Sequence, residues 1–312
     1  MRVLVTGADG FVGRYVLSAL RAAGHDLVAC HRSGAKIPSW SVGSIEWRPL
    51  ELGEAASVAQ AAAGGFDGVL HLAALSSGSA ARRDPGLAWD VNAAGTARVV
   101  EALAQGRSKE SPGPVVVVVS SGEVYGSTGR QPIDEAMPAR PVSPYAASKL
   151  GAEEAARETA RRTGLRVIIA RPFAHTGAGQ LPDFVAPAFA RRLRAARAAG
   201  ERTVSTGNLE PVRDFLDVRD VARAYAGLLV SGVPGETYNI ARGEGVTLRD
   251  LFNRLAALIG VEVEPVPDPA LVRTADIPYL VGNAAKLAAA TGWSPQIPLD
   301  QMLRDLTHAE TD

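Results

Sequence analysis

Cysteine is nearly absent from the sequence: Cys30 is the only one among 312 residues. One thiol cannot close an internal disulfide, and a metal centre needs several Cys, His or carboxylate ligands at set spacings, which the sequence does not contain. A disulfide-rich secreted scaffold and a metal site are therefore both unexpected. Cys30 itself is interpreted as a small buried apolar residue in a reduced compartment.

An excess of charge is also missing, since 33 Lys and Arg balance 33 Asp and Glu. A nucleic-acid partner needs a basic excess to neutralise many phosphates, so none is expected. The longest aliphatic run, residues 115–119, is far too short to span a bilayer. The N-terminus lacks the charged region, apolar stretch and cleavage site of a signal peptide. We therefore expect a soluble cytoplasmic protein with no membrane partner.

The first half of the chain alternates short β-branched runs with longer Ala-rich helical stretches, which is typical of βαβ units. The predicted strands are residues 3–6, 27–30, 68–72, 115–120 and 166–170, and the predicted helices are 12–23, 58–63, 92–104 and 145–163. The strands are apolar throughout, which favours burial on both faces. The sequence therefore predicts an α/β fold of the Rossmann type, with a doubly wound parallel sheet.

A glycine-rich turn follows the first predicted strand and opens the first predicted helix. Gly7, Gly10 and Gly13 would allow a tight turn, a close approach of the backbone to a pyrophosphate and close packing of helix on strand, while the helix N-terminus supplies donors. This placement predicts a dinucleotide site with Phe11 and Val12 in the turn. The alternative is an ordinary turn with no ligand.

The second predicted strand ends in Cys30-His31-Arg32, with no acidic residue. An acid at this point hydrogen-bonds the ribose 2′-hydroxyl of NAD, and a base accommodates the 2′-phosphate of NADP. Arg32 therefore predicts a preference for NADP(H), with NAD(H) as the second choice. The alternative is a solvated loop arginine.

After Arg171-Pro172 the sequence changes to proline-punctuated loops, a basic helix near residues 191–199, short strands such as 236–240, and helices at 218–229 and 248–259. We expect two domains whose boundary is not a single cut. Residues 1–172 with about 214–243 would form the NADP-binding domain. Residues 173–213 and 244–312 would form a smaller α/β substrate-binding region.

Three side chains have the chemistry of a proton-transfer site. Tyr145 and Lys149 lie four residues apart in a predicted helix, so both emerge on one face, where the ammonium would lower the pKa of the phenol. Ser121 follows a predicted strand at the carboxyl edge of the sheet, where its hydroxyl could bind a substrate carbonyl. The alternatives are an accidental pair on a surface helix and a loop serine bonded to local backbone.

Taken together, these motifs resemble those of the extended short-chain dehydrogenase/reductases that act on nucleotide sugars. The resemblance runs nearly end to end. It rests on Gly7–Gly13, Glu51-Leu52, His71–Ala74, Asn92 with Gly95-Thr96, Ser121–Gly126 and Tyr145–Lys149.

The resemblance implies roles for individual residues. Ser121 would be the catalytic Ser/Thr, Tyr145 the proton donor and Lys149 its ribose-binding partner, while His71 would be structural and not a ligand. Further cofactor contacts are implied at Glu51, Leu52, Leu72, Ala73, Ala74, Pro172 and His175. The family also implies a homodimer joined through the helices at 92–104 and 145–163.

The C-terminal half is similar to the branch of the family that reduces GDP-linked 4-keto-6-deoxy sugars, which implies a nucleotide diphosphate sugar as ligand. The implied substrate contacts are Ser76, Glu123, Phe184, Asn208, Arg213 and Arg273. Arg213 and Arg273 suit a diphosphate because a guanidinium donates to two oxygens at once, and their alternative is surface ion pairing. Ala174 departs from the family, which has Asn there, and removes an amide expected to contact the substrate.

The sequence therefore predicts an NADPH-dependent 4-ketoreductase. A sugar-nucleotide 4-epimerase would use the same three residues with tightly held NAD. A 4,6-dehydratase would use Glu123 as a base, but Gly122 leaves its acid role empty. A non-catalytic NADP-binding regulator is the remaining alternative, and the intact set of Ser121, Tyr145 and Lys149 argues against it.

Overall fold

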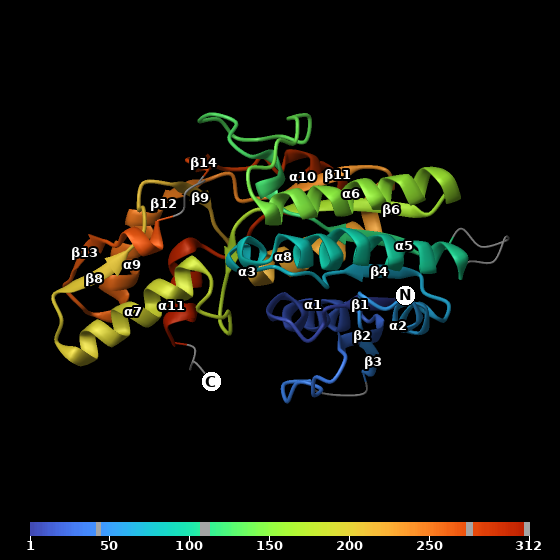
Figure 1. Cartoon of the computed structure of the whole chain (residues 1–312), viewed down its shortest axis with the longest axis horizontal. Helices are drawn as coiled ribbons and strands as arrows, with labels where there is room; N and C mark the ends of the chain where they lie inside the picture. Colours follow the sequence, from blue (N-terminus) through green and yellow to red (C-terminus); the bar gives the residue numbers. More distant parts are fainter. Residues whose placement is uncertain (42–44, 107–112, 273–276, 309–312) are drawn as a thin grey trace.

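A computed structural model describes residues 1–41, 45–106, 113–272 and 277–308 (Figure 1). Arg273, a predicted substrate contact, lies outside the described residues. Within them, no helix is both long and apolar enough to cross a membrane.

The largest sheet has seven strands, and every neighbouring pair is parallel. The order across it is β11-β6-β5-β4-β1-β2-β3. Its strands are β1 (Arg2–Thr6), β2 (Asp26–Arg32), β3 (Glu46–Leu50), β4 (Gly68–His71), β5 (Val115–Val119), β6 (Arg166–Pro172) and β11 (Thr237–Ile240). The chain reverses its direction of progress between β1 and β4, which is the switch point where ligands of open α/β sheets bind.

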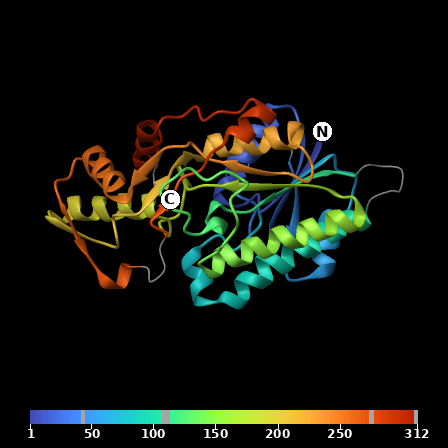
Figure 2. The ribbon, with the colours of Figure 1, turned by 90° about the horizontal axis from the view of Figure 1, so that it is seen from above.

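Helices cover both faces of this sheet, as Figures 1 and 2 show. One face carries α1 (Phe11–Ala22), α8 (Val218–Ser231) and α10 (Ala285–Thr291). The other carries α2 (Ala55–Ala62), α5 (Gly95–Gln105) and α6 (Pro144–Thr163). The valines of β5 alternate between the two cores, with Val117 in the first and Val116 and Val118 in the second. The predicted doubly wound α/β fold is therefore confirmed.

The remaining elements gather beyond one end of this sheet (Figure 1). The helices are α7 (Val185–Ala199), α9 (Leu248–Ile259) and α11 (Leu299–His308), which share a separate apolar core. Three small sheets accompany them. They are formed by β7 (His175–Thr176) with β10 (Leu216–Asp217), by β8 (Thr203–Thr206) with β13 (Glu264–Pro267), and by β12 (Gly245–Thr247), β9 (Val212–Asp214) and β14 (Tyr279–Leu280).

Short helical pieces complete the chain. They are α3 (Gly78–Arg83), α4 (Pro85–Ala88), a π-helical turn (Trp89–Ala94) and 3₁₀ turns at Gly122–Tyr125 and Pro269–Leu271. The helix predicted at 92–104 therefore begins as a π-helical turn and becomes α-helical only at Gly95.

Two features of the sheet differ from the sequence-based expectation. Strand β3 was not predicted, because its sequence carries no apolar run: Trp47 and Arg48 are partly buried and Pro49 is exposed. Strand β2 continues to Arg32, two residues beyond the predicted end, because it pairs with β3 as far as Leu50. Arg32 therefore belongs to the strand and not to a loop.

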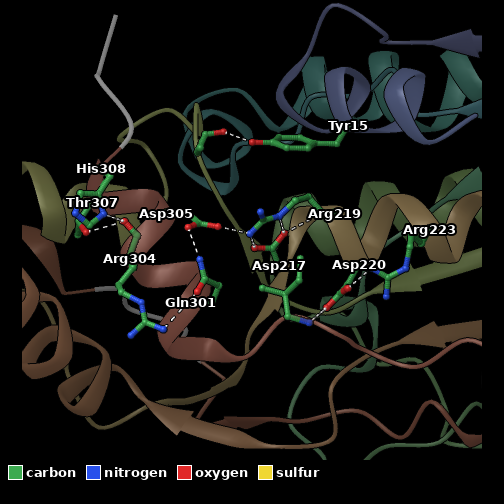
Figure 3. Close-up of polar contacts among 12 residues, drawn as sticks. Tyr15, Asp217, Arg219, Asp220, Arg223, Gln301, Arg304, Asp305, Thr307 and His308 are labelled. Carbon is green, nitrogen blue, oxygen red and sulfur yellow. Dashed lines mark hydrogen bonds and ion pairs between the residues drawn. The ribbon is translucent and has the colours of Figure 1, made fainter. Parts of the chain in front are cut away.

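Polar contacts join the two parts of the molecule (Figure 3). Arg219, at the start of α8, donates to both carboxylate oxygens of Asp217 and also to Asp305 of α11. The Tyr15 hydroxyl of α1 donates to the Ala178 carbonyl at 2.8 Å, which ties the segment after β7 to the first helix. These contacts fix the C-terminal elements against the edge of the sheet that carries the candidate site.

Asp220 fastens the segment before α11 to α8. Its fully buried carboxylate pairs with Arg223 at 2.6 Å and accepts the backbone N–H groups of Gln296 and Ile297, each at 3.0 Å. We predict that Asp220→Ala lowers the free energy of unfolding by about 2 to 4 kcal/mol, because the ion pair of a fully buried carboxylate is lost and two part-buried N–H groups lose their acceptor. Urea denaturation measures this. Asp300→Ala, at an exposed carboxylate, is the control, and an equal loss in both variants would contradict the assignment.

Candidate active site

Most of the predicted cofactor-binding and catalytic residues lie at the carboxyl edge of the seven-stranded sheet. Because all its strands are parallel, the segments that follow β1, β2, β4, β5 and β6 open at this one edge. The glycine turn follows β1, Leu72–Ala74 follow β4, and Ser121 follows β5. Pro172 ends β6. Glu51 and Leu52 lie just beyond β3.

The glycine turn is built for close backbone approach. Gly7 has φ +67°, and a Cβ there would lie 2.7 Å from the Ala73 backbone nitrogen. A Cβ on Gly13 would lie 2.4 Å from the Ala8 carbonyl oxygen, so only glycine allows α1 to pack this closely on the turn. Gly10 is the N-cap of α1, and no side chain caps the helix there. This leaves the helix N-terminus open to an anion, so the turn fits the pyrophosphate of a dinucleotide.

The end of β2 is tied to this turn. The Ala8 backbone N–H donates to the Cys30 carbonyl at 3.0 Å, and the Arg32 backbone N–H donates to the Asp9 carboxylate at 3.0 Å. Cys30 is fully buried, and burial raises the pKa of its thiol to about 12. The thiol is therefore inert, as its interpretation as a packing residue requires.

The other predicted cofactor residues occupy ordinary packing positions on the same edge. The Leu52 side chain packs against Gly95, and the Leu52 carbonyl accepts from Arg98 at 3.0 Å. Glu51 is partly exposed. The His175 Nδ1 donates to the Phe173 carbonyl at 3.0 Å, and burial lowers the pKa of this histidine. His175 is thus a neutral side chain.

Ser121, Glu123 and Tyr145 lie together. The Ser121 hydroxyl accepts the Glu123 backbone N–H at 3.1 Å and caps the 3₁₀ turn that carries Glu123. Burial and the Glu123 charge raise the pKa of Tyr145 above its usual value, and a hydrogen bond with Ser121 opposes them. We predicted a lowered pKa for this phenol, and that expectation was wrong. Tyr145 therefore holds its proton at neutral pH.

Lys149 is not among the groups that shift the pKa of Tyr145. Its ammonium donates to the Val119 carbonyl, at the last residue of β5. Burial lowers the pKa of Lys149 to about 8, and the charge of Glu153 opposes this shift. The ammonium is thus held at the strand end beside Ser121, with a proton that it can lose near physiological pH.

Glu153 is a site residue that the sequence analysis missed. It lies one helical turn after Lys149 in α6 and is fully buried. It accepts from the Ser120 hydroxyl at 2.5 Å, from two nitrogens of Arg171 at 2.8 and 2.6 Å, and from Arg157 at 3.0 Å. Arg171 also lies over the Tyr125 ring, 4.7 Å from its centroid. The spacing of Lys149 and Glu153 on one helix face was the available signal.

A second buried network surrounds His71, whose pKa falls to about 3 because of burial and of Lys149. The Thr96 hydroxyl donates its one hydrogen to the Asn92 carbonyl at 2.6 Å, so His71 Nε2 must donate to Thr96 and Nδ1 must accept from Thr6 at 2.7 Å. His71 is therefore neutral and structural. Asn92 in turn bonds the Leu75 backbone and the Ser148 hydroxyl.

The predicted substrate residues are more dispersed. Ser76 is exposed in the segment after β4, and Phe184 is the N-cap of α7. Asn208 is exposed and accepts from the Glu210 N–H at 3.0 Å, within its own turn. Arg213 in β9 donates to the Ile277 carbonyl at 2.7 Å. Neither of these two bonds reaches Ser121, Tyr145 or Lys149. In the described part of the chain, no group of three or more His, Cys, Asp or Glu could hold a metal ion.

Comparison with known proteins agrees with this geometry. The family model described as "NAD dependent epimerase/dehydratase family" matches residues 3–241. GDP-6-deoxy-D-mannose reductase from Pseudomonas aeruginosa is 37% identical over 311 residues, which cover 97% of this chain and 95% of that protein.

Two solved structures are similar over nearly the whole chain. RMD from Pseudomonas aeruginosa, complexed with NADPH, has a TM-score of 0.82 and 34% identity, covering 98% of this chain and 97% of its own. The Thermus thermophilus UDP-glucose 4-epimerase complex with NAD has a TM-score of 0.85 and 29% identity, covering 98% of each chain.

Because His71 is buried and neutral, we predict that the stability of the fold depends on pH. Its pKa is about 3 in the folded state and about 6.5 in an unfolded chain, so the unfolded state binds an extra proton between these values. Stability is therefore lost as the pH falls below about 6.5. We expect His71→Gln to remove up to about 1.4 kcal/mol per pH unit of this dependence. Urea denaturation from pH 7 to pH 5 measures it, and equal slopes in variant and wild type would refute the assignment.

Proposed function

The chain belongs to the NAD-dependent epimerase/dehydratase family, and we propose that it is an NADPH-dependent reductase of a nucleotide-linked 4-keto-6-deoxy sugar. The observation that carries the proposal is that Tyr145 and Lys149 of α6 meet Ser121 and the end of β5 at the edge of the parallel sheet that also carries the glycine turn. Relatives act on nucleotide sugars, which supports this substrate class.

The residues that would hold the cofactor line that edge. The glycine turn and the N-terminus of α1 would take the pyrophosphate, Arg32 the 2′-phosphate, and Leu72–Ala74 the body of the dinucleotide. When bound, the cofactor supplies the hydride.

Proton delivery is the task of the chain's own side chains. Ser121 and Tyr145 would hydrogen-bond the ketone oxygen, and Tyr145 would give its proton to that oxygen as negative charge develops. The raised pKa of Tyr145 suits this role, because the phenol is loaded with its proton before reaction. Lys149, held beside Ser121, would stabilise the phenolate that is left.

Two observations support this proposal over the other activities of the family. An epimerase begins by oxidising a hydroxyl and needs Tyr145 as a base, whereas a reductase needs it as an acid, and the raised pKa of Tyr145 agrees with the acid role. A 4,6-dehydratase needs an acid near Glu123, but a Cβ on Gly122 would press on the Phe173 ring at 3.1 Å. Glu123 is therefore assigned to orienting the sugar.

We also propose which nucleotide the substrate carries, which residues form the cofactor-binding domain, and how two copies of the chain associate. We assign GDP as the nucleotide, on the similarity to a GDP-sugar reductase, with Arg213, Asn208 and Phe184 in the substrate-binding region. Residues 1–172 with about 214–243 would bind the cofactor, since they supply nearly all of the two cores that flank the seven-stranded sheet, to which Leu287 and Trp293 are added from the C-terminal part. The homodimer would form through α5 and α6, which lie side by side (Figure 2).

Tyr145→Phe tests the proton donor. The variant keeps the ring and the fold, so we expect cofactor affinity to be largely kept while turnover falls by roughly 10² to 10⁴. The assay follows NADPH consumption with GDP-, dTDP- and UDP-linked 4-keto-6-deoxy sugars, and the GDP sugar should be the preferred substrate. Near-normal turnover would remove Tyr145 from the mechanism, and no consumption with any sugar would refute the reductase.

Glu153→Gln tests the electrostatic support of Lys149. Removing the carboxylate takes away the charge that holds the Lys149 pKa up, so this pKa, about 8 in the native protein, should fall by roughly one unit. Turnover needs the protonated lysine, so its alkaline limb should move to lower pH. The pH profile of turnover measures the shift. Glu154→Gln, on the exposed face of α6, is the matched control, and identical profiles for both variants would contradict the role.

A further inference from the structure

Two opposite charges lie at the end of β2. The Asp9 carboxylate comes from the turn after β1, and the Arg32 guanidinium comes from the last residue of the strand. We infer that Asp9 is a specificity-determining residue, whose carboxylate stands in for the acid that β2 lacks and opposes Arg32 in the choice between NAD(H) and NADP(H). The inference rests on the proposed function, because it concerns the cofactor which that function requires.

Asp9 is held at the strand end by its hydrogen bond to the backbone. Its Oδ2 accepts the Arg32 N–H at 3.0 Å, and the neighbouring Ala8 N–H donates to the Cys30 carbonyl, also at 3.0 Å. These two bonds draw the turn after β1 onto the last residues of β2. The Asp9 side chain is only half-buried, so solvent or a ligand can reach it. The carboxylate thus lies at the position where the adenosine ribose of a dinucleotide is recognised.

Neither charge is neutralised by a partner side chain. Across the described residues, the Arg32 guanidinium is exposed and has no ion pair, and the only bond of the Asp9 side chain is the one to the Arg32 backbone. The Asp9 charge nevertheless acts on its surroundings, since it contributes to the raised pKa of the buried Cys30 thiol. Both charges are therefore available to a ligand at this point.

The two charges distinguish the two cofactors in opposite directions. A ribose 2′-hydroxyl is a donor, and a carboxylate accepts from it, as the strand-end acid of NAD-binding proteins does. A 2′-phosphate carries no such hydrogen at neutral pH, and its negative charges are repelled by Asp9 while Arg32 attracts them. Asp9 therefore reduces the NADPH preference that Arg32 alone would give and keeps NADH as a usable cofactor.

An anchoring role alone would not need a charge, because a neutral amide or hydroxyl oxygen can also accept the Arg32 N–H. Asp9→Asn keeps that acceptor and removes only the charge. We expect this variant to bind NADPH about tenfold more tightly and NADH less tightly than the native protein. Arg32→Ala should bind NADPH less tightly than the native protein. Asp26→Asn, at the opposite end of β2, makes the same change in net charge and should leave both affinities unchanged.

The test measures dissociation constants for NADPH and NADH by isothermal titration calorimetry, without substrate, on the folded native protein and the three variants. An unchanged NADPH/NADH ratio in Asp9→Asn, with the expected loss in Arg32→Ala, would leave Asp9 as an anchor and overturn the inference alone. Absence of binding of either cofactor to the native protein would overturn the proposed function as well. Should Asp9→Asn fail to fold by circular dichroism, Asp9→Ser retains an acceptor and must show the same change in ratio.

Discussion

The parallel direction of all seven strands is the constraint on which the site depends. It sends every segment that follows a strand to one edge, so residues from separate parts of the chain meet there although they are far apart in sequence. The glycine turn, the end of β2, Leu72–Ala74, Ser121 and Pro172 lie along the same edge for this reason. The C-terminal elements lie against that edge. The contacts of Arg219 with Asp305 and of Tyr15 with Ala178 hold them there.

Buried polar networks give this edge its fixed geometry. The Glu153 carboxylate binds Ser120, Arg171 and Arg157 next to Ser121, the proposed catalytic serine. His71, Thr96 and Asn92 form the second network, behind the segment after β4. Such networks rigidify a site when every member is satisfied, since breaking one partner leaves a buried group without a bond. We therefore propose that these networks position Tyr145 and Lys149.

Much of this could be predicted from the sequence, because the information is local. Strands such as β5 are continuous apolar runs, Leu248–Ile259 has helical periodicity from end to end, and the glycine turn carries its own spacing. What the sequence could not supply depends on distant pairing. Strand β3 owes its existence to β2, the raised pKa of Tyr145 depends on burial beside Glu123, and Lys149 bonds a strand carbonyl in preference to the phenol. Asp9 comes beside Arg32 only when the turn meets the end of β2.

As proposed, this edge brings a hydride from NADPH and a proton from Tyr145 to a ketone, with no return step. The most direct measurement uses NADPH deuterated at the transferring position of C4, with a GDP-linked 4-keto-6-deoxy sugar. NMR of the product then locates the label. We expect one deuterium at sugar C4 for each NADPH oxidised. Product that forms without deuterium and without net oxidation of NADPH would contradict it.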